Sequence, residues 1–305
     1  MAGYPGSLFG ATGAWRGPSF TADMKKQIAD EVASVQSTLG TNPQGDAATV
    51  AARLTALETL ITTYLSAPLI NLRLTNNTTT PNTKVDLTAD VLSVQGATLS
   101  NVSTTIDIGV TGVNGLDTGS ASAGTWYYIY AIYNLATLTF AGLFSLNQTT
   151  PTLPSGYTLY RRVGAVRRNA SNVFLNFEQR NQLVVYGTSE SADYRLLSLG
   201  VQTAFTTVTL AAAVPPTTTI ATVNAVLNGS LASSAAWSLT LRRGGSSDAG
   251  WIASTVYAPA GTAVDGRSAV AVRLSATQQV DYKINIAPQA SSGAYLDVLG
   301  YLDPI

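Results

Sequence analysis

A change of hydrophobic pattern at Pro68 constrains the fold of this chain more than any other feature. Before Pro68, apolar residues recur every three or four positions, as they do along one face of an α-helix. After it, short runs of β-branched and aromatic residues alternate with Gly, Asn, Pro and Ser. We therefore expect a mainly β protein in which a helical, coiled-coil-like stem precedes two β-sandwich-like modules. The expected segments are an arm over residues 1–20, the stem over 21–66, a central β module over 67–190 and a C-terminal β-sandwich over 191–305.

The expected stem holds two helices, over residues 21–39 and 46–65. In the second helix, apolar residues are spaced alternately by four and three positions, which is the heptad pattern of a coiled coil. Such a seam buries its side chains against other helices, so we expect the stem to oligomerise. The heptads are few, and an amphipathic helix packed on a domain is the alternative. The seam residues are Val50, Leu54, Leu57, Ile61 and Tyr64.

The central module contains a run, residues 126–133, that is apolar on both faces. Such a strand is expected to lie sandwiched between layers or subunits. A hairpin is also expected, because residues 157–168 and 173–177 flank a turn of Asn, Ala and Ser whose asparagines tolerate left-handed backbone. The first strand of this hairpin is basic. Its arginines are Arg161, Arg162, Arg167 and Arg168.

Strand-like runs also fill the C-terminal module and predict a sandwich. The sixth run alternates strictly, so Val280 and Tyr282 are expected inside while Asp281 and Lys283 face water. The runs are 205–210, 219–227, 237–242, 251–257, 269–274, 280–286 and 295–302.

Composition argues against several kinds of chemistry. The chain has neither Cys nor His, so disulfides, thiolate nucleophiles and the usual transition-metal sites are excluded, and we expect no cofactor. The formal net charge is zero, which disfavours nucleic acid as a partner. No apolar stretch is long enough to span a membrane, so no membrane insertion is expected. Most acidic residues of the β modules are expected in turns or on wet strand positions, and no two form a glycosidase pair. We therefore expect no enzymatic activity.

Aromatic residues punctuate a glycine-rich N-terminal arm. Such a segment is too aromatic for a free tail and too rich in glycine for a helix. We expect Phe9, Trp15 and Phe20 to anchor it to a partner, and folding back onto its own chain is the alternative.

Two polar groups of the β modules are candidate binding sites. The hairpin arginines present planar forks that suit phosphate or acidic sugar, although edge protection or pairing between subunits is favoured for them. The preferred ligand or receptor loop is a glycine-rich turn between two tryptophans, an arrangement that an ordinary hairpin tip explains equally well. Its expected ligand-binding residues are Arg242, Arg243, Asp248 and Trp251.

The central module resembles one that recurs in fibre proteins of tailed bacteriophages. The similar segments are GVNGLDTGSASAGTWYYIYAIYN over residues 112–134 and AGLFSLNQTTPTLPSGYTLYRRVGAVRRNASNVFLNFEQ over residues 141–179. In that family a D-T-G turn precedes a TWYYVY-like strand, and a PTLPSGY turn leads into an RVGAVR strand. Residues 39–58 also resemble trimeric necks of phage fibres, and YLDVLGYLD over residues 295–303 resembles the closing strand of their C-terminal domains.

The resemblance implies a structural protein located in the virion. It implies a homotrimer, joined through the neck seam, that attaches to another virion protein through the arm. A tail fibre or spike subunit would present its C-terminal β domain to a host-surface glycan or receptor. A head fibre or capsid decoration protein and a tail or baseplate adaptor are the alternatives.

Overall fold

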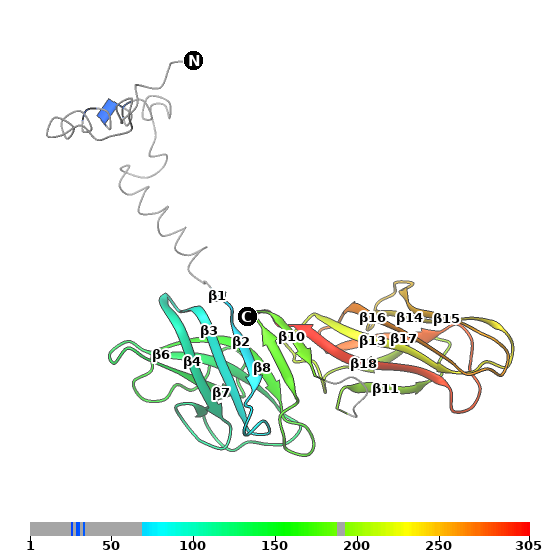
Figure 1. Ribbon diagram of the computed structural model, residues 1–305, viewed down its shortest axis with the longest axis horizontal. Helices are drawn as coiled ribbons and strands as arrows, with labels where there is room; N and C mark the ends of the chain where they lie inside the picture. The colour runs from blue at the N-terminus through cyan, green and yellow to red at the C-terminus, as the bar shows by residue number, and fades with distance from the viewer. Residues whose placement is uncertain (1–25, 27–28, 31–32, 34–68, 188–192) are drawn as a thin grey trace. The chain divides into compact units, whose positions relative to one another are not determined.

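The structure is a computed structural model that describes Lys26, Ala29, Asp30, Ala33 and residues 69–187 and 193–305 (Figure 1). The four residues of the expected stem are helical and exposed, and Lys26 Nζ lies 2.8 Å from Asp30 Oδ2 one turn later. A continuous helical stem is not seen. The remainder of residues 21–66, including the seam from Val50 to Tyr64, lies outside the described residues. The arm with Phe9, Trp15 and Phe20 also lies outside them.

Strands dominate the described residues, which confirms the mainly β prediction. The strands vary in length from two to eleven residues. Turn residues that the sequence supplies lie between many of them. The strands are β1 (Leu69–Ile70), β2 (Arg73–Asn76), β3 (Lys84–Val94), β4 (Ala97–Asp107), β5 (Gly115–Leu116), β6 (Trp126–Asn134), β7 (Thr139–Ser145), β8 (Leu159–Arg167), β9 (Phe177–Arg180), β10 (Leu183–Tyr186), β11 (Arg195–Gly200), β12 (Thr206–Thr209), β13 (Ile220–Gly229), β14 (Ala235–Arg243), β15 (Trp251–Ala258), β16 (Val264–Arg273), β17 (Gln279–Ile284) and β18 (Gly293–Leu302).

Three sheets organise these strands. The largest has ten strands and runs in the order β1-β3-β2-β9-β10-β18-β13-β16, with β4 also paired to β3 and β11 to β18. A four-stranded sheet, β5-β7-β6-β8, packs on one half of it through β3 and β4. The other four-stranded sheet, β12-β17-β14-β15, packs on the second half through β13 and β16. Two β-sandwiches therefore share one long sheet (Figure 1).

Strand β6 is buried on both faces, as its sequence predicted. Alternate side chains, Tyr127 and Ile129 among them, enter the main core between the sheets. Those between them, including Tyr130, enter a second apolar cluster with Leu143 and Ala165. Tyr130 donates its hydroxyl proton to the backbone oxygen of Asn147, 2.8 Å away, so the segment after β7 covers this face. The strand thus lies between layers of the same chain.

The strands expected in the C-terminal module all form, with shifted ends. Strand β11 was missed, because its sequence, RLLSLG, lacks a clean alternation and its pairing with β18 shifts register. The expected hairpin forms only in part. Its turn is present, since the Asn169 backbone N–H donates to the Val173 oxygen at 2.8 Å. Beyond the turn, Arg168 and Phe174 form an isolated bridge, and β9 pairs with β2 and β10 instead of β8. Burial of Asp281 contradicts the prediction that it faces water, because only 3% of this residue is exposed.

The two sandwiches join where β10 pairs antiparallel with β18. The register places Val184 opposite Tyr301 and Val185 opposite Gly300. A Cβ at Gly300 would lie 2.1 Å from the Val184 oxygen, so the strands approach this closely only because residue 300 is glycine. Residues 69–187 and 193–305 accordingly belong to one compact unit, within which the expected central and C-terminal modules share a sheet.

Candidate functional site

The arginines of the basic β8 hairpin all contact groups of their own chain. Arg161 donates to the Ser93 backbone oxygen at 3.1 Å, and Arg167 donates to the Ala212 oxygen at 2.7 Å. Arg168 donates to the Asn172 oxygen and lies 6.0 Å from the centre of the Phe174 ring. Burial lowers the pKa of these three guanidinium groups below their usual value. These arginines connect parts of the fold, and their donors are not free to bind a phosphate.

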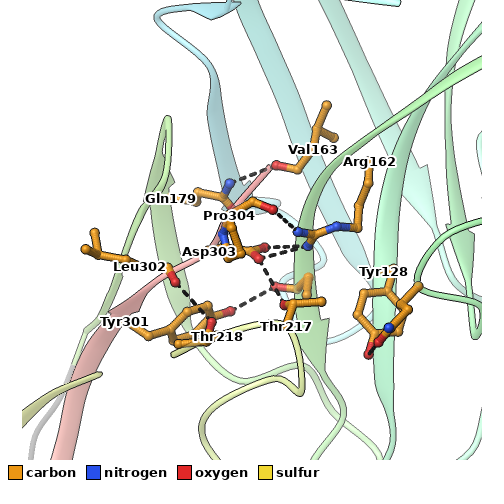
Figure 2. A network of polar contacts seen from close by, with 12 residues as sticks. Tyr128, Arg162, Val163, Gln179, Thr217, Thr218, Tyr301, Leu302, Asp303 and Pro304 are labelled. Carbon is orange, nitrogen blue, oxygen red and sulfur yellow. Dashed lines mark hydrogen bonds and ion pairs between the residues drawn. The ribbon is translucent and has the colours of Figure 1, made fainter. Parts of the chain in front are cut away.

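The fourth arginine, Arg162, binds Asp303 and Pro304, which follow β18 (Figure 2). Its Nη1 lies 2.8 and 2.9 Å from the two carboxylate oxygens of Asp303, and its Nη2 donates to the Pro304 oxygen. Thr217 donates its hydroxyl proton to Asp303 at 3.0 Å. The Asp303 side chain is fully buried and only 13% of the Arg162 side chain is exposed. This ion pair joins β8 of one sandwich to the residues that follow β18.

Two further aspartates of the C-terminal sandwich are buried against arginines. Asp297 accepts two hydrogen bonds from Arg195, at 2.7 and 3.1 Å, and its side chain is fully buried. Asp281 accepts one from Arg242 Nε at 3.0 Å. For these residues and Asp303, the expectation of solvated carboxylates is wrong, because each has a charged partner, distant in sequence, that replaces water.

Arg242, a predicted ligand residue, is held on the outer face of the sheet that contains β14. Its guanidinium carbon lies 3.8 Å from the centre of the Phe205 ring, and its Nη1 donates to the Asp248 backbone oxygen at 2.9 Å. Thr207 and the Gly245 N–H also donate to Asp281. Arg242 therefore organises the loop that follows β14, because its donors are committed to protein groups.

The other predicted loop residues do not join Arg242 in one cluster. Side chains alternate along a strand, so Arg243 lies on the face of β14 opposite to that of Arg242. Trp251, the first residue of β15, pairs with Leu241, which places it on the same face as Arg243; 39% of the residue is exposed. The Asp248 carboxylate accepts from the Ser246 hydroxyl at 2.6 Å. The expected four-residue site is therefore divided between two faces of the sheet.

Arg243 instead lines a pocket with Arg273, the last residue of β16. The pocket has a volume of about 390 Å³ and includes Thr219, Ser275 and Gln278 in its wall. Both arginines are exposed, and no Asp or Glu of the described chain lines the pocket. Sequence reasoning predicted Arg243 as a ligand residue but missed Arg273. Arg273 lies thirty positions later and belongs to the other sheet, so it meets Arg243 only through the packing of the two sheets.

A second pocket, of about 440 Å³, lies beside β9 and β10. Leu183 and Val185, both about half exposed, form its apolar part. Glu178 at its rim is paired with Arg73 and Arg180, at 3.2 and 2.7 Å. This pocket presents apolar surface with neutralised charges at its edge.

Several tyrosines near the shared sheet have a pKa that the fold raises. Burial raises the pKa of Tyr186, Tyr301 and Tyr130 well above that of a free phenol. Burial also raises the pKa of Tyr194 to about 12. These hydroxyls donate to backbone oxygens, Tyr194 to Asn176 at 2.9 Å and Tyr186 to Ala213 at 2.5 Å, which suits a structural role.

Within residues 69–187 and 193–305 and the four helical residues, no three His, Cys, Asp or Glu side chains gather as a metal site would require. No helix of the described chain is long and apolar enough to cross a membrane. No protein-family model matches this sequence, and no curated protein is significantly similar to it.

Proposed function

We propose that this protein is a structural subunit of a tailed-bacteriophage particle, a homotrimeric tail fibre or spike protein. Its N-terminal arm attaches it to another virion protein, and its C-terminal sandwich faces the host surface. The observation that carries the proposal is the mutual contact of the segments that resemble phage fibre modules. The Asp117 carboxylate of the D-T-G turn accepts a hydrogen bond from the Thr152 N–H of the PTLPSGY turn, at 3.0 Å.

The strands that follow those two turns also pair with each other. The register of β6 and β8 places Tyr128 opposite Ala165 and Ile129 opposite Gly164. A Cβ at Gly164 would lie 2.4 Å from atoms of Leu74 and Gln179, so glycine in this strand lets the sheets pack closely. Residues that are distant in sequence thus form one module, which supports treating the resemblance as a single inherited unit.

Exposed apolar side chains support assembly with further subunits. Strand β15 is at the edge of its sheet, and Ile252 and Tyr257 on it are 64% and 65% exposed. An unpaired strand edge with large apolar side chains is a favourable surface for association.

Electron microscopy of intact particles, with antibody raised against the full chain, tests the proposal. Label on tail fibres or spikes is expected. Label on capsomers would favour the head fibre alternative, and label at the baseplate the adaptor. Absence of the protein from purified particles would refute a virion role. Host-cell binding by the full chain, compared with that of its Arg243→Ala/Trp251→Ala variant, then tests recognition by the C-terminal sandwich.

Sedimentation analysis tests the trimer separately. We expect a trimer, and we expect Leu57→Asp to weaken it because an unpaired charge would enter the neck seam. Ala56→Asp lies next to the seam and is the matched control, since it adds the same charge outside the a and d positions. A folded monomer of the unmodified chain at micromolar concentration would contradict the assignment.

A further inference from the structure

We infer that the pocket between Arg243 and Arg273 binds a compact polar anion, a carboxylate or phosphate carried by a sugar. The inference concerns the chemistry of the purified chain and does not depend on the proposed function. The side chain of neither arginine forms an ion pair or hydrogen bond within the described residues, whereas the arginines in and directly after β8 are all hydrogen-bonded.

The positive charges of the pocket are not neutralised locally. The acidic residues that flank it in the fold are occupied elsewhere. Asp281 follows the strand partner of Arg243, and its carboxylate accepts from Arg242. Asp303 is next to Leu302, whose backbone oxygen accepts from Thr218 in the pocket wall, and its carboxylate pairs with Arg162. Two cations with no acidic neighbour in the wall favour a negatively charged occupant.

The wall is also built to hold a small polar molecule. Arg243 ends β14 in the four-stranded sheet, and Arg273 ends β16 in the ten-stranded sheet, so the two charges come from different layers. The turn between β16 and β17 is fixed by hydrogen bonds from the Gln278 amide to the Pro216 and Ala276 oxygens, at 3.3 and 3.1 Å. A volume of about 390 Å³ accommodates a monosaccharide. Guanidinium groups hold carboxylates and phosphates through paired N–H donors.

Calorimetric titration of the full chain at low salt tests the inference, with D-glucuronate, inorganic phosphate and D-glucose as probes. Binding of glucuronate or phosphate, and none of glucose, is expected. Glucuronate alone would identify a carboxylate as the bound group, and phosphate alone would identify a phosphate group. A concentration of about 10 mM would detect even a site with a millimolar dissociation constant, so no binding of either anion at that concentration would overturn the inference.

Substitutions locate the binding. Arg243→Gln and Arg273→Gln should each weaken it at least about tenfold, because each removes charge-assisted hydrogen bonds. Arg180→Gln removes the same charge from an exposed arginine outside the pocket and should leave the affinity within about twofold. Lysine at 243 and 273 should restore the affinity only partly, because lysine lacks the planar fork. An equal loss of affinity in Arg180→Gln would overturn the assignment. Binding that persists in the double variant Arg243→Gln/Arg273→Gln would also overturn it.

Discussion

The Arg162–Asp303 ion pair provides the sharpest test of how the two sandwiches are held together. In Asp303→Asn the side chain keeps its shape but loses its charge, and Arg162 remains with 13% of its side chain exposed. Removing one partner of a buried pair costs about 3–5 kcal/mol, because the other charge stays desolvated. For a unit of 240 residues, obtained from the bounds 66 and 305, this corresponds to a fall in Tm of roughly 6–20 °C.

Chemical denaturation followed by tryptophan fluorescence measures this free energy. Trp126 lies 6.3 Å from Tyr301 in an edge-on contact, so one reporter is beside the junction. Asp265→Asn is the matched control, because Asp265 pairs with Arg267 at 2.8 Å with 40% of its side chain exposed. Such surface pairs contribute about 0–1 kcal/mol.

A double variant separates the attraction from the cost of burying charge. Arg162→Met/Asp303→Leu removes both charges, and we expect it to be less destabilised than the sum of the single changes by at least about 2 kcal/mol. If Asp303→Asn changes the free energy of unfolding by no more than Asp265→Asn does, the reasoning about this junction is refuted.

Three further predictions follow from the same fold. Gly300→Ala should destabilise the protein by at least about 2 kcal/mol in denaturant titration, because the added methyl group meets the Val184 oxygen; exposed Leu302→Ala on the same strand should cost less than about 1 kcal/mol. Asp281→Asn should cost about 2–4 kcal/mol, since Arg242 would be left without its charged partner, and a cost as small as that of Asp265→Asn would contradict this. Burial raises the pKa of Tyr194 to about 12, so above pH 10 the folded state binds more protons than the unfolded state. The free energy of unfolding should therefore fall by about 1.4 kcal/mol per pH unit from this group between pH 10 and 12. If the absorbance of ionised tyrosine shows that all tyrosines of the folded protein titrate near pH 10, this prediction is refuted.

The sequence determined the local structure of the described part of the chain. Alternation and turn residues placed β13, β14 and β15 close to their observed bounds, and the two apolar faces of β6 predicted its position between layers. These signals are local, because the period of the side chains and the backbone preference of turn residues act over a few positions.

Tertiary structure decided which residues meet. Arg162 and Asp303 are 141 positions apart, and nothing in either local pattern indicates that they pair. The same holds for Asp281. Its place in the alternating pattern predicted a solvent-exposed side chain, whereas in the fold it pairs with Arg242, which lies over the Phe205 ring. The predicted ligand loop also depended on tertiary structure. Strand alternation placed Arg242 and Arg243 on opposite faces, and the packing of two sheets brought Arg273 close to Arg243. Burial of a charge and the composition of a pocket depend on strand order and register, which periodicity alone does not specify.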